Sequence, residues 1–157
     1  MAISCRVTRG DLTESIHVAF AVAVDKNGQI FFSSGDPNYL TCIRSSLKPF
    51  QAAASIKAGA IDSVKFSDEE IALMCASHQG EQIHTDKVFS MLQKLDLDIE
   101  DYECGAHAPS DKKTRYSLVK ASKSASALYN NCRGKHARMM ALAKHLGKGI
   151  KGYTNKE

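Results

Sequence analysis

Residues 16–36, IHVAFAVAVDKNGQIFFSSGD, decide how the chain begins to fold. Two runs rich in apolar and β-branched residues flank Asn27 and Gly28. This dipeptide favours a type I′ turn, because both central residues of that turn take positive φ. We therefore predict strands over 16–24 and 29–34, joined as an antiparallel hairpin.

Helical patterns dominate the sequence that follows the hairpin. Small and apolar residues lead to Gly59, which stands where a glycine ends a helix, and Ser67 with Glu70 has the spacing of a capping box. Because Pro49 lacks an amide hydrogen and disfavours helical geometry at Lys48, the first of these helices must start late or have an irregular first turn. The patterns predict helices over 45–58, 68–78, 83–95 and 132–146. The expected fold class is α+β, with the hairpin packed on several helices.

The bulk properties fit a single domain over residues 1–157. The chain is 43% hydrophobic and 24% charged, and a chain of this length can bury a sizeable core. No apolar run approaches the length that crosses a bilayer, and the first ten residues lack the apolar core of a signal peptide. We expect a cytoplasmic protein with no membrane partner. An odd number of cysteines, five, favours reduced thiols or metal ligands over a disulfide framework.

Charge is divided unevenly along the chain. Residues 1–110 carry nine Lys and Arg against fifteen Asp and Glu, whereas residues 111–157 carry twelve against two. A basic segment of this kind can contact nucleic acid, an acidic protein or an acidic part of the same fold. Aromatic residues among the lysines are few, so base stacking has little support and no nucleic-acid partner is expected. A non-catalytic binding module with a basic C-terminal segment remains an alternative.

The pattern Ser-x-x-Lys occurs three times and can mark a nucleophile with its base. The pairs are Ser45 with Lys48, Ser110 with Lys113, and Ser117 with Lys120. The last two lie in a lysine-rich stretch where the amine should be solvated and protonated. Ser45 and Lys48 precede an alanine-rich helix, where three-residue spacing puts the amine within reach of the hydroxyl and desolvation favours a neutral amine. From the residues alone, helix capping is the favoured interpretation of this pair.

Cysteine and histidine recur at a spacing that zinc sites use. Cys75 and His78, and then Cys104 and His107, both follow the pattern Cys-x-x-His. Buried cysteine more often serves as a small apolar residue, so separate structural roles are the alternative. The stretch NNCRGKHA at 130–137 is the densest polar cluster and begins a helix, which suits an anion as well as simple capping.

Five ordered blocks resemble the asparaginase family of the rhizobial type, also called L-asparaginase II. They are RGDLTESIH, IRSSLKPFQ, GAIDSVKFSDEEIALMCASHQGEQIH, CGAHAP and NNCRGKHA, and the similarity runs from Arg9 to Tyr153. The resemblance implies the fold of serine β-lactamases and glutaminases. It also implies hydrolysis of L-asparagine to L-aspartate and ammonia through a serine acyl-enzyme.

The resemblance also assigns roles to individual residues. Ser45 and Lys48 match the catalytic pair, Ser77 matches the second active-site serine, and Arg44 lies beside the nucleophile and contributes to substrate binding.

Cys132 and Lys135 match two ligands of a zinc site that in the family contains a second cysteine, and His136 would line the same pocket. Zinc is therefore an expected cofactor, with a role in holding the substrate. Arg133 and Arg138 depart from the serine and the small residue that are usual in the family, and two added cations should weaken metal binding or reshape the pocket entrance.

Family members continue beyond the sequence that ends at Glu157, and the further part supplies the second zinc cysteine and a lysine paired with the second serine. The resemblance thus predicts an N-terminal portion of the domain, truncated at the C-terminal side and weak or inactive alone. A homodimer or a complementing C-terminal chain is the expected protein partner. A glutaminase-like or penicillin-recognising acyl hydrolase is the alternative enzyme, although the Ser-Asp-Asn and Lys-Thr-Gly motifs of the latter are not found.

Overall fold

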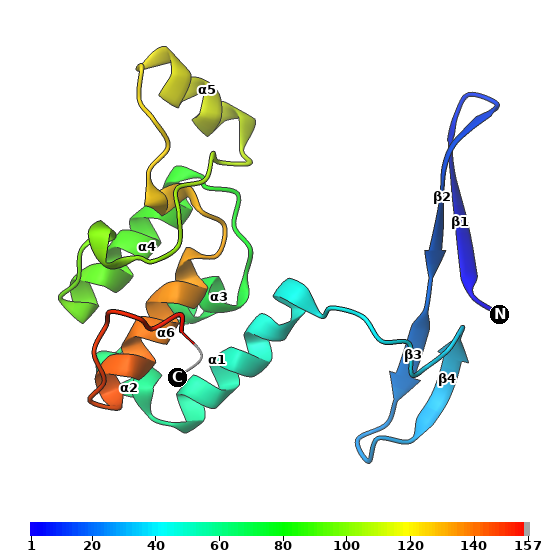
Figure 1. Cartoon of the computed structure of the whole chain (residues 1–157), viewed down its shortest axis with the longest axis horizontal. Coiled ribbons are helices and arrows are strands. Elements are labelled where there is room, and N and C mark those ends of the chain that lie inside the picture. The colour runs from blue at the N-terminus through cyan, green and yellow to red at the C-terminus, as the bar shows by residue number, and fades with distance from the viewer. Residues whose placement is uncertain (156–157) are drawn as a thin grey trace. The chain divides into compact units, whose positions relative to one another are not determined.

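The computed structural model describes residues 1–155, and the chain divides into two compact units (Figure 1). The first unit is Met1–Cys42 and the second is Ile43–Glu157. This division does not test whether residues 1–157 form one domain, so that expectation stays a prediction. No helix among the described residues is long and apolar enough to span a bilayer.

The first unit consists of two antiparallel hairpins. Strands β1 (Ile3–Arg9) and β2 (Leu12–Ala19) pair with each other, and β3 (Ala21–Val24) pairs with β4 (Ile30–Ser34). The predicted hairpin around Asn27 and Gly28 is confirmed as β3 and β4. The predicted strand over 16–24 is two strands, and the β1–β2 hairpin was not predicted.

The turn between β3 and β4 is not the type I′ turn that the sequence suggested. Gly28 has φ of 83°, whereas Asn27 is not among the residues with positive φ. The carboxylate of Asp25 explains the difference, because it accepts hydrogen bonds at 2.8 Å from the amides of Asn27 and Gln29. An aspartate that bonds to its own turn in this way holds the loop in a right-handed conformation, and glycine alone then takes the left-handed position.

The second unit is helical. Its α-helices are α1 (Lys48–Lys57), α2 (Ala60–Val64), α3 (Asp68–Cys75), α4 (Gln82–Leu95), α5 (Lys112–Lys120) and α6 (Arg133–His145). Short 3-10 turns η1 (Arg44–Leu47), η2 (Ile99–Asp101) and η3 (Ala127–Tyr129) connect them. Antiparallel hairpins together with these helices agree with the predicted α+β class at the level of mixed secondary structure.

Local capping signals correctly predicted the start of α3 and the end of α1. The capping box of Ser67 and Glu70 is present, and Gly59 follows α1 with φ of 80°. The helix predicted over 68–78 ends early, at Cys75, and α2 was missed. Helix α5 was also missed, because its residues were read as a solvated turn; Asp111 caps it by accepting a hydrogen bond from the amide of Thr114 at 2.6 Å.

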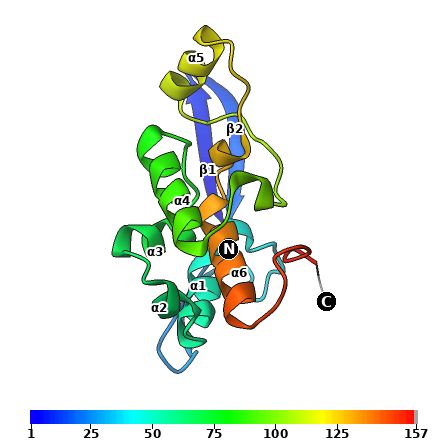
Figure 2. The ribbon, with the colours of Figure 1, turned by 90° about the vertical axis from the view of Figure 1, so that its left-hand side faces the viewer.

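Helix α6 organises the second unit, since it contacts α1, α2, α3 and α4 (Figure 1, Figure 2). Its buried residues Ala137 and Met140 join Met74 from α3 and Met91 and Leu92 from α4 in one core. Gly134, at the start of α6, lies against the end of α3. A Cβ on Gly134 would stand 2.3 Å from the carbonyl oxygen of Leu73. Only glycine therefore permits this approach of the two helices.

Substitution Gly134→Ala is expected to lower the free energy of unfolding. Alanine favours a helix by about 1 kcal/mol over glycine, but overpacking against backbone costs about 1–3 kcal/mol or more, and the clash here is severe. The clash should therefore prevail. Urea unfolding followed by circular dichroism measures the change, with Ala141→Gly as the matched helix control. A more stable Gly134→Ala variant would contradict the close approach of α6 to α3.

Candidate active site

Ser45 lies in the 3-10 turn η1, which leads directly into α1. Pro49 stands in the first turn of α1, where its missing amide hydrogen costs nothing. The residue before Ser45 is unusual, because Arg44 has φ of 50°, in the left-handed region that non-glycine residues seldom adopt. Strained backbone of this kind is concentrated at functional sites. The irregular start that Pro49 implied is thus present and contains Ser45.

Lys48 is buried, with 3% of its surface exposed, and its amine makes two hydrogen bonds. Nζ donates to the carbonyl oxygen of Ala76 at 2.6 Å and to Oγ of Ser77 at 2.7 Å. Ser77 Oγ in turn donates to Ser45 Oγ at 3.2 Å. We predicted direct contact between Lys48 and Ser45, but Ser77 lies between them in this hydrogen-bond chain. The three predicted catalytic residues are therefore joined in the order Lys48, Ser77, Ser45.

Ser77 reaches this position from the loop between α3 and α4. The backbone leaves the helix at Ala76, which has extended φ and ψ of −95° and 165°. The predicted helix through residue 78 would have continued past this point. Because the helix ends before Ser77, the Ala76 carbonyl is available to Lys48, and the side chain of Ser77 can lie beside Ser45.

A cavity of about 320 Å³ adjoins the hydrogen-bonded residues. It is lined by Arg44, Ser45, Lys48, Gln51, Cys132 and Lys135. Five of these six residues were predicted for the site from the sequence. Gln51 was missed, although it lies three residues after Lys48 in α1 and so faces the same side of the helix. The cavity thus brings the start of α1 together with the start of α6.

His136 is not among the residues that line this cavity, and its role in substrate binding stays a prediction. Its Nδ1 lies 3.0 Å from the hydroxyl of Tyr153, and the ring meets that of Tyr102 edge to face. Successive helix residues are about 100° apart, so His136 faces away from Lys135. Burial, with Lys135 and Arg133 nearby, lowers the pKa of His136 to about 4.

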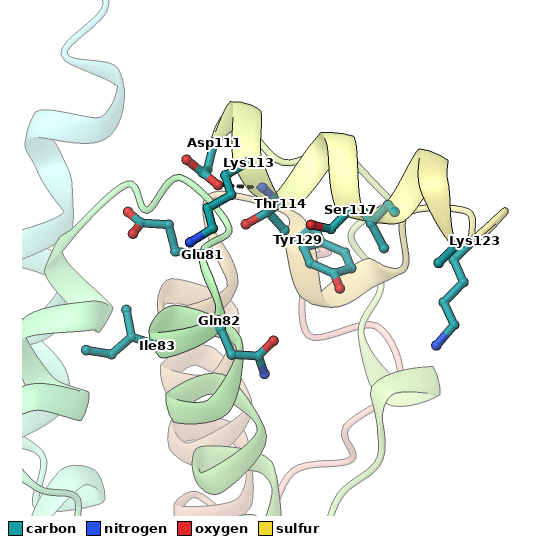
Figure 3. A pocket seen from close by; sticks show the side chains of 11 residues that line it. Glu81, Gln82, Ile83, Asp111, Lys113, Thr114, Ser117, Lys123 and Tyr129 are labelled. Carbon is teal, nitrogen blue, oxygen red and sulfur yellow. Dashed lines mark hydrogen bonds between the residues drawn. The ribbon is translucent and has the colours of Figure 1, made fainter.

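A larger cavity of about 560 Å³ lies beneath α5, away from Ser45 (Figure 3). Thr114 and Ser117 on α5 face Gln82 at the start of α4, and Tyr129 lies beside them. The residues Lys113 and Lys120 of the other two Ser-x-x-Lys pairs are exposed. Neither lysine has the buried setting that Lys48 has, so these two pairs do not form a comparable site.

Comparison with known proteins identifies the family. A model of the L-asparaginase II family matches residues 5–157. The chain belongs to the L-asparaginase II family. No curated protein matches the chain. Membership confirms the resemblance read from the five sequence blocks and supports an amidohydrolase of the asparaginase type.

The predicted zinc ligands of this L-asparaginase II family member do not make a complete metal site. Cys132 and Lys135 both line the cavity beside Ser45, but they supply one thiol and one amine. Among residues 1–155, no three side chains of His, Cys, Asp or Glu gather as a metal site would require. The two Cys-x-x-His pairs therefore do not form a zinc centre either. Zinc binding at Cys132 and Lys135 therefore stays a prediction, and no step of the proposed reaction uses a metal ion.

The two arginines that depart from the family pattern, which we expected to weaken metal binding or reshape the pocket entrance, are buried and do not line the cavity. Arg133 is fully buried, stacks over the ring of Tyr102 at 4.0 Å, and donates to the carbonyl of Cys104 at 2.8 Å. Arg138 donates from Nη1 to the carbonyl of Gln51 at 2.6 Å and to Oγ of Ser55 at 2.8 Å. Burial lowers the pKa of both guanidinium groups, and neither forms a salt bridge within residues 1–155.

Replacing Arg138 by methionine is expected to stabilise the protein. Burial of a cation without an anionic partner costs free energy, and an apolar residue of similar length removes that cost. Ser55 Oγ can still donate to the Gln51 carbonyl, which it already approaches at 3.3 Å. We expect Arg138→Met to raise the free energy of unfolding by about 1 kcal/mol. Urea unfolding measures the change in the free energy of unfolding, with the exposed Arg115→Met as control. A loss of stability in Arg138→Met would contradict the conclusion that the buried cation destabilises the fold.

Proposed function

We propose that the chain hydrolyses the side-chain amide of L-asparagine through an acyl-enzyme on Ser45. The observation that carries the proposal is the hydrogen-bonded order Lys48, Ser77, Ser45 beside a cavity. Family membership supports the choice of an amide substrate. The strained φ of Arg44, the residue before Ser45, further supports a functional role for the turn.

Acylation begins when Ser45 Oγ attacks the amide carbon of the substrate. The two serine hydroxyls reorient so that the Ser45 proton moves to Ser77, and the Ser77 proton moves to a neutral Lys48 amine. The lysine can do this while it still donates one hydrogen bond to the Ala76 carbonyl. Ser77 thus serves as a relay between base and nucleophile.

Release of ammonia and of aspartate uses the same relay. The proton returns from Lys48 through Ser77 to the departing nitrogen, the carbon–nitrogen bond breaks, and an aspartyl ester remains on Ser45. A water molecule then attacks the ester carbonyl and gives up one proton to the relay. The ester bond breaks, Ser45 recovers its proton, and aspartate leaves.

Recognition of the substrate carboxylate is assigned to the cations of the cavity. Arg44 and Lys135 line it together with Ser45, and the guanidinium of Arg44 can bind a carboxylate through two hydrogen bonds. The β-lactamase and glutaminase fold is proposed on the same basis, from family membership and the mixed α/β content.

Ammonia release tests the proposed function. The purified chain is incubated with L-asparagine, and with L-glutamine in parallel, and ammonia is measured over time against the Ser45→Ala variant. We expect release from asparagine that depends on Ser45, and robust release would contradict the expectation, drawn from the resemblance, that the chain is weak or inactive alone. Faster release from glutamine would change the proposed substrate but keep the acyl-enzyme chemistry. Release that is equal in the wild-type chain and Ser45→Ala would contradict the proposal.

A further inference from the structure

The loop that carries Ser77 is held at each of its residues from 76 to 80. Lys48 bonds to the carbonyl of Ala76, and the amide of His78 donates to the carbonyl of Asn131 at 3.2 Å. The amide of Asp111 donates to the carbonyl of Gln79 at 2.9 Å. The start of α6 and the cap of α5 therefore both fix the loop from outside.

His78 also fixes the loop from within. Its ring nitrogen Nδ1 accepts a hydrogen bond from the amide of Gly80 at 3.2 Å, which closes a turn immediately after Ser77. An imidazole that accepts at Nδ1 is neutral and carries its hydrogen on Nε2. Burial, with His84, Lys48 and Arg133 nearby, lowers the pKa of His78 to about 4, so the neutral form persists at neutral pH.

Gly80 can be the donor because of its backbone conformation. It has φ of 82°, and a Cβ at this position would stand 2.8 Å from Cβ of Pro109. The turn is therefore packed against Pro109 on one side and bonded to His78 on the other. The ring of His78 stacks on that of His84, with centroids 5.3 Å apart, and 5% of the residue is exposed.

We propose that His78 is a positioning residue, whose Nδ1 holds the turn to Gly80 and thereby keeps Ser77 between Lys48 and Ser45. The inference rests on the proposed function, in which Ser77 relays the proton. It assigns to the histidine next to Ser77 a role distinct from metal binding, to which the Cys75-x-x-His78 spacing had pointed. Ser77 Oγ must lie within hydrogen-bond distance of two other side-chain atoms, so small movements of the loop break the relay.

Loss of the hydrogen bond between the Gly80 amide and His78 Nδ1 should lower kcat. Displacement of a reacting group by about 1 Å can cost about 100-fold in rate. The cavity residues that bind substrate come from η1, α1 and the start of α6, so KM should change little. A residue that only stabilised the fold would leave kcat of the folded protein unchanged.

Two substitutions of His78 separate these roles. His78→Asn keeps an acceptor oxygen near the position of Nδ1, whereas His78→Leu keeps apolar volume without an acceptor. His84→Leu is the matched control, because His84 stacks on the same ring and makes no hydrogen bond to residues 76–80 in the described structure. We expect kcat for asparagine to fall about 100-fold in His78→Leu, to recover largely in His78→Asn, and to stay near the wild-type value in His84→Leu.

Hydrogen exchange of the Gly80 amide gives a second readout that does not depend on catalysis. We expect slow exchange in the wild-type chain and in His78→Asn, and fast exchange in His78→Leu. If the wild-type chain releases no ammonia, the proposed function fails, and this exchange pattern alone decides whether His78 positions the loop. Equal exchange in all variants, or a kcat of His78→Asn no better than that of His78→Leu, would overturn the inference.

Discussion

Substitution Ser45→Ala is expected to abolish asparagine hydrolysis, with a fall in kcat of about 10⁴-fold or more. The Ser45 hydroxyl lies at the end of the hydrogen-bonded relay and is the group that forms the ester in the proposed reaction. The fold should be unaffected, because Ser45 lies in an exposed turn and contributes no core contact. Steady-state ammonia release measures the loss, and thermal unfolding confirms the fold.

Ser110→Ala is the matched control for this experiment. Ser110 begins another Ser-x-x-Lys pattern but is exposed and lies in the segment that precedes α5. Its removal should leave kcat within about twofold of wild type, since surface substitutions away from the site rarely have larger effects. If Ser110→Ala lost activity and Ser45→Ala kept it, the choice among the three patterns would be wrong.

Substitution Lys48→Met should be nearly as damaging, with kcat reduced by about 10²–10⁴-fold. Methionine fills the same buried space but cannot accept the proton that Ser77 passes on. Lys48→Arg should fail as well, because a guanidinium stays protonated and cannot act as a base. Ammonia release over a range of pH measures both variants, with the exposed Lys113→Met as control.

The two Lys48 variants also distinguish a base from a simple positive charge. Activity in Lys48→Arg close to wild type, together with loss in Lys48→Met, would mean that Lys48 acts only through its charge. That result would remove the proton relay from the mechanism and leave Ser45 without its proposed base.

Local sequence signals predicted the elements that local interactions determine. Ser67 and Glu70 cap α3 through bonds within one turn, and a glycine at residue 59 ends α1, so both boundaries could be read directly. The hairpin was placed correctly, but its turn type depends on the carboxylate of Asp25, which the dipeptide rule ignores. Helix α5 has no buried residue, so no apolar periodicity could reveal it.

The arrangement of the site residues could not be predicted without the tertiary structure, whereas several helix boundaries could. Spacing placed Ser45 and Lys48 together, but the position of Ser77 between them joins residues 32 apart in the chain. The left-handed backbone conformation of Arg44, at the start of the turn that contains Ser45, likewise cannot be predicted from sequence patterns. Arg133 and Arg138 were expected to affect metal binding or the pocket entrance because they are close to Lys135 in the sequence, yet both side chains are buried in the interior.

Covalent trapping on Ser45 tests the central claim most directly. The chain is mixed with L-asparagine, quenched in acid within milliseconds, digested and examined by mass spectrometry. The account predicts that the peptide containing Ser45 gains the mass of one aspartyl group and that Ser45→Ala shows no gain. Rapid ammonia release without any modified Ser45 peptide, or with the aspartyl group on another residue, would contradict it.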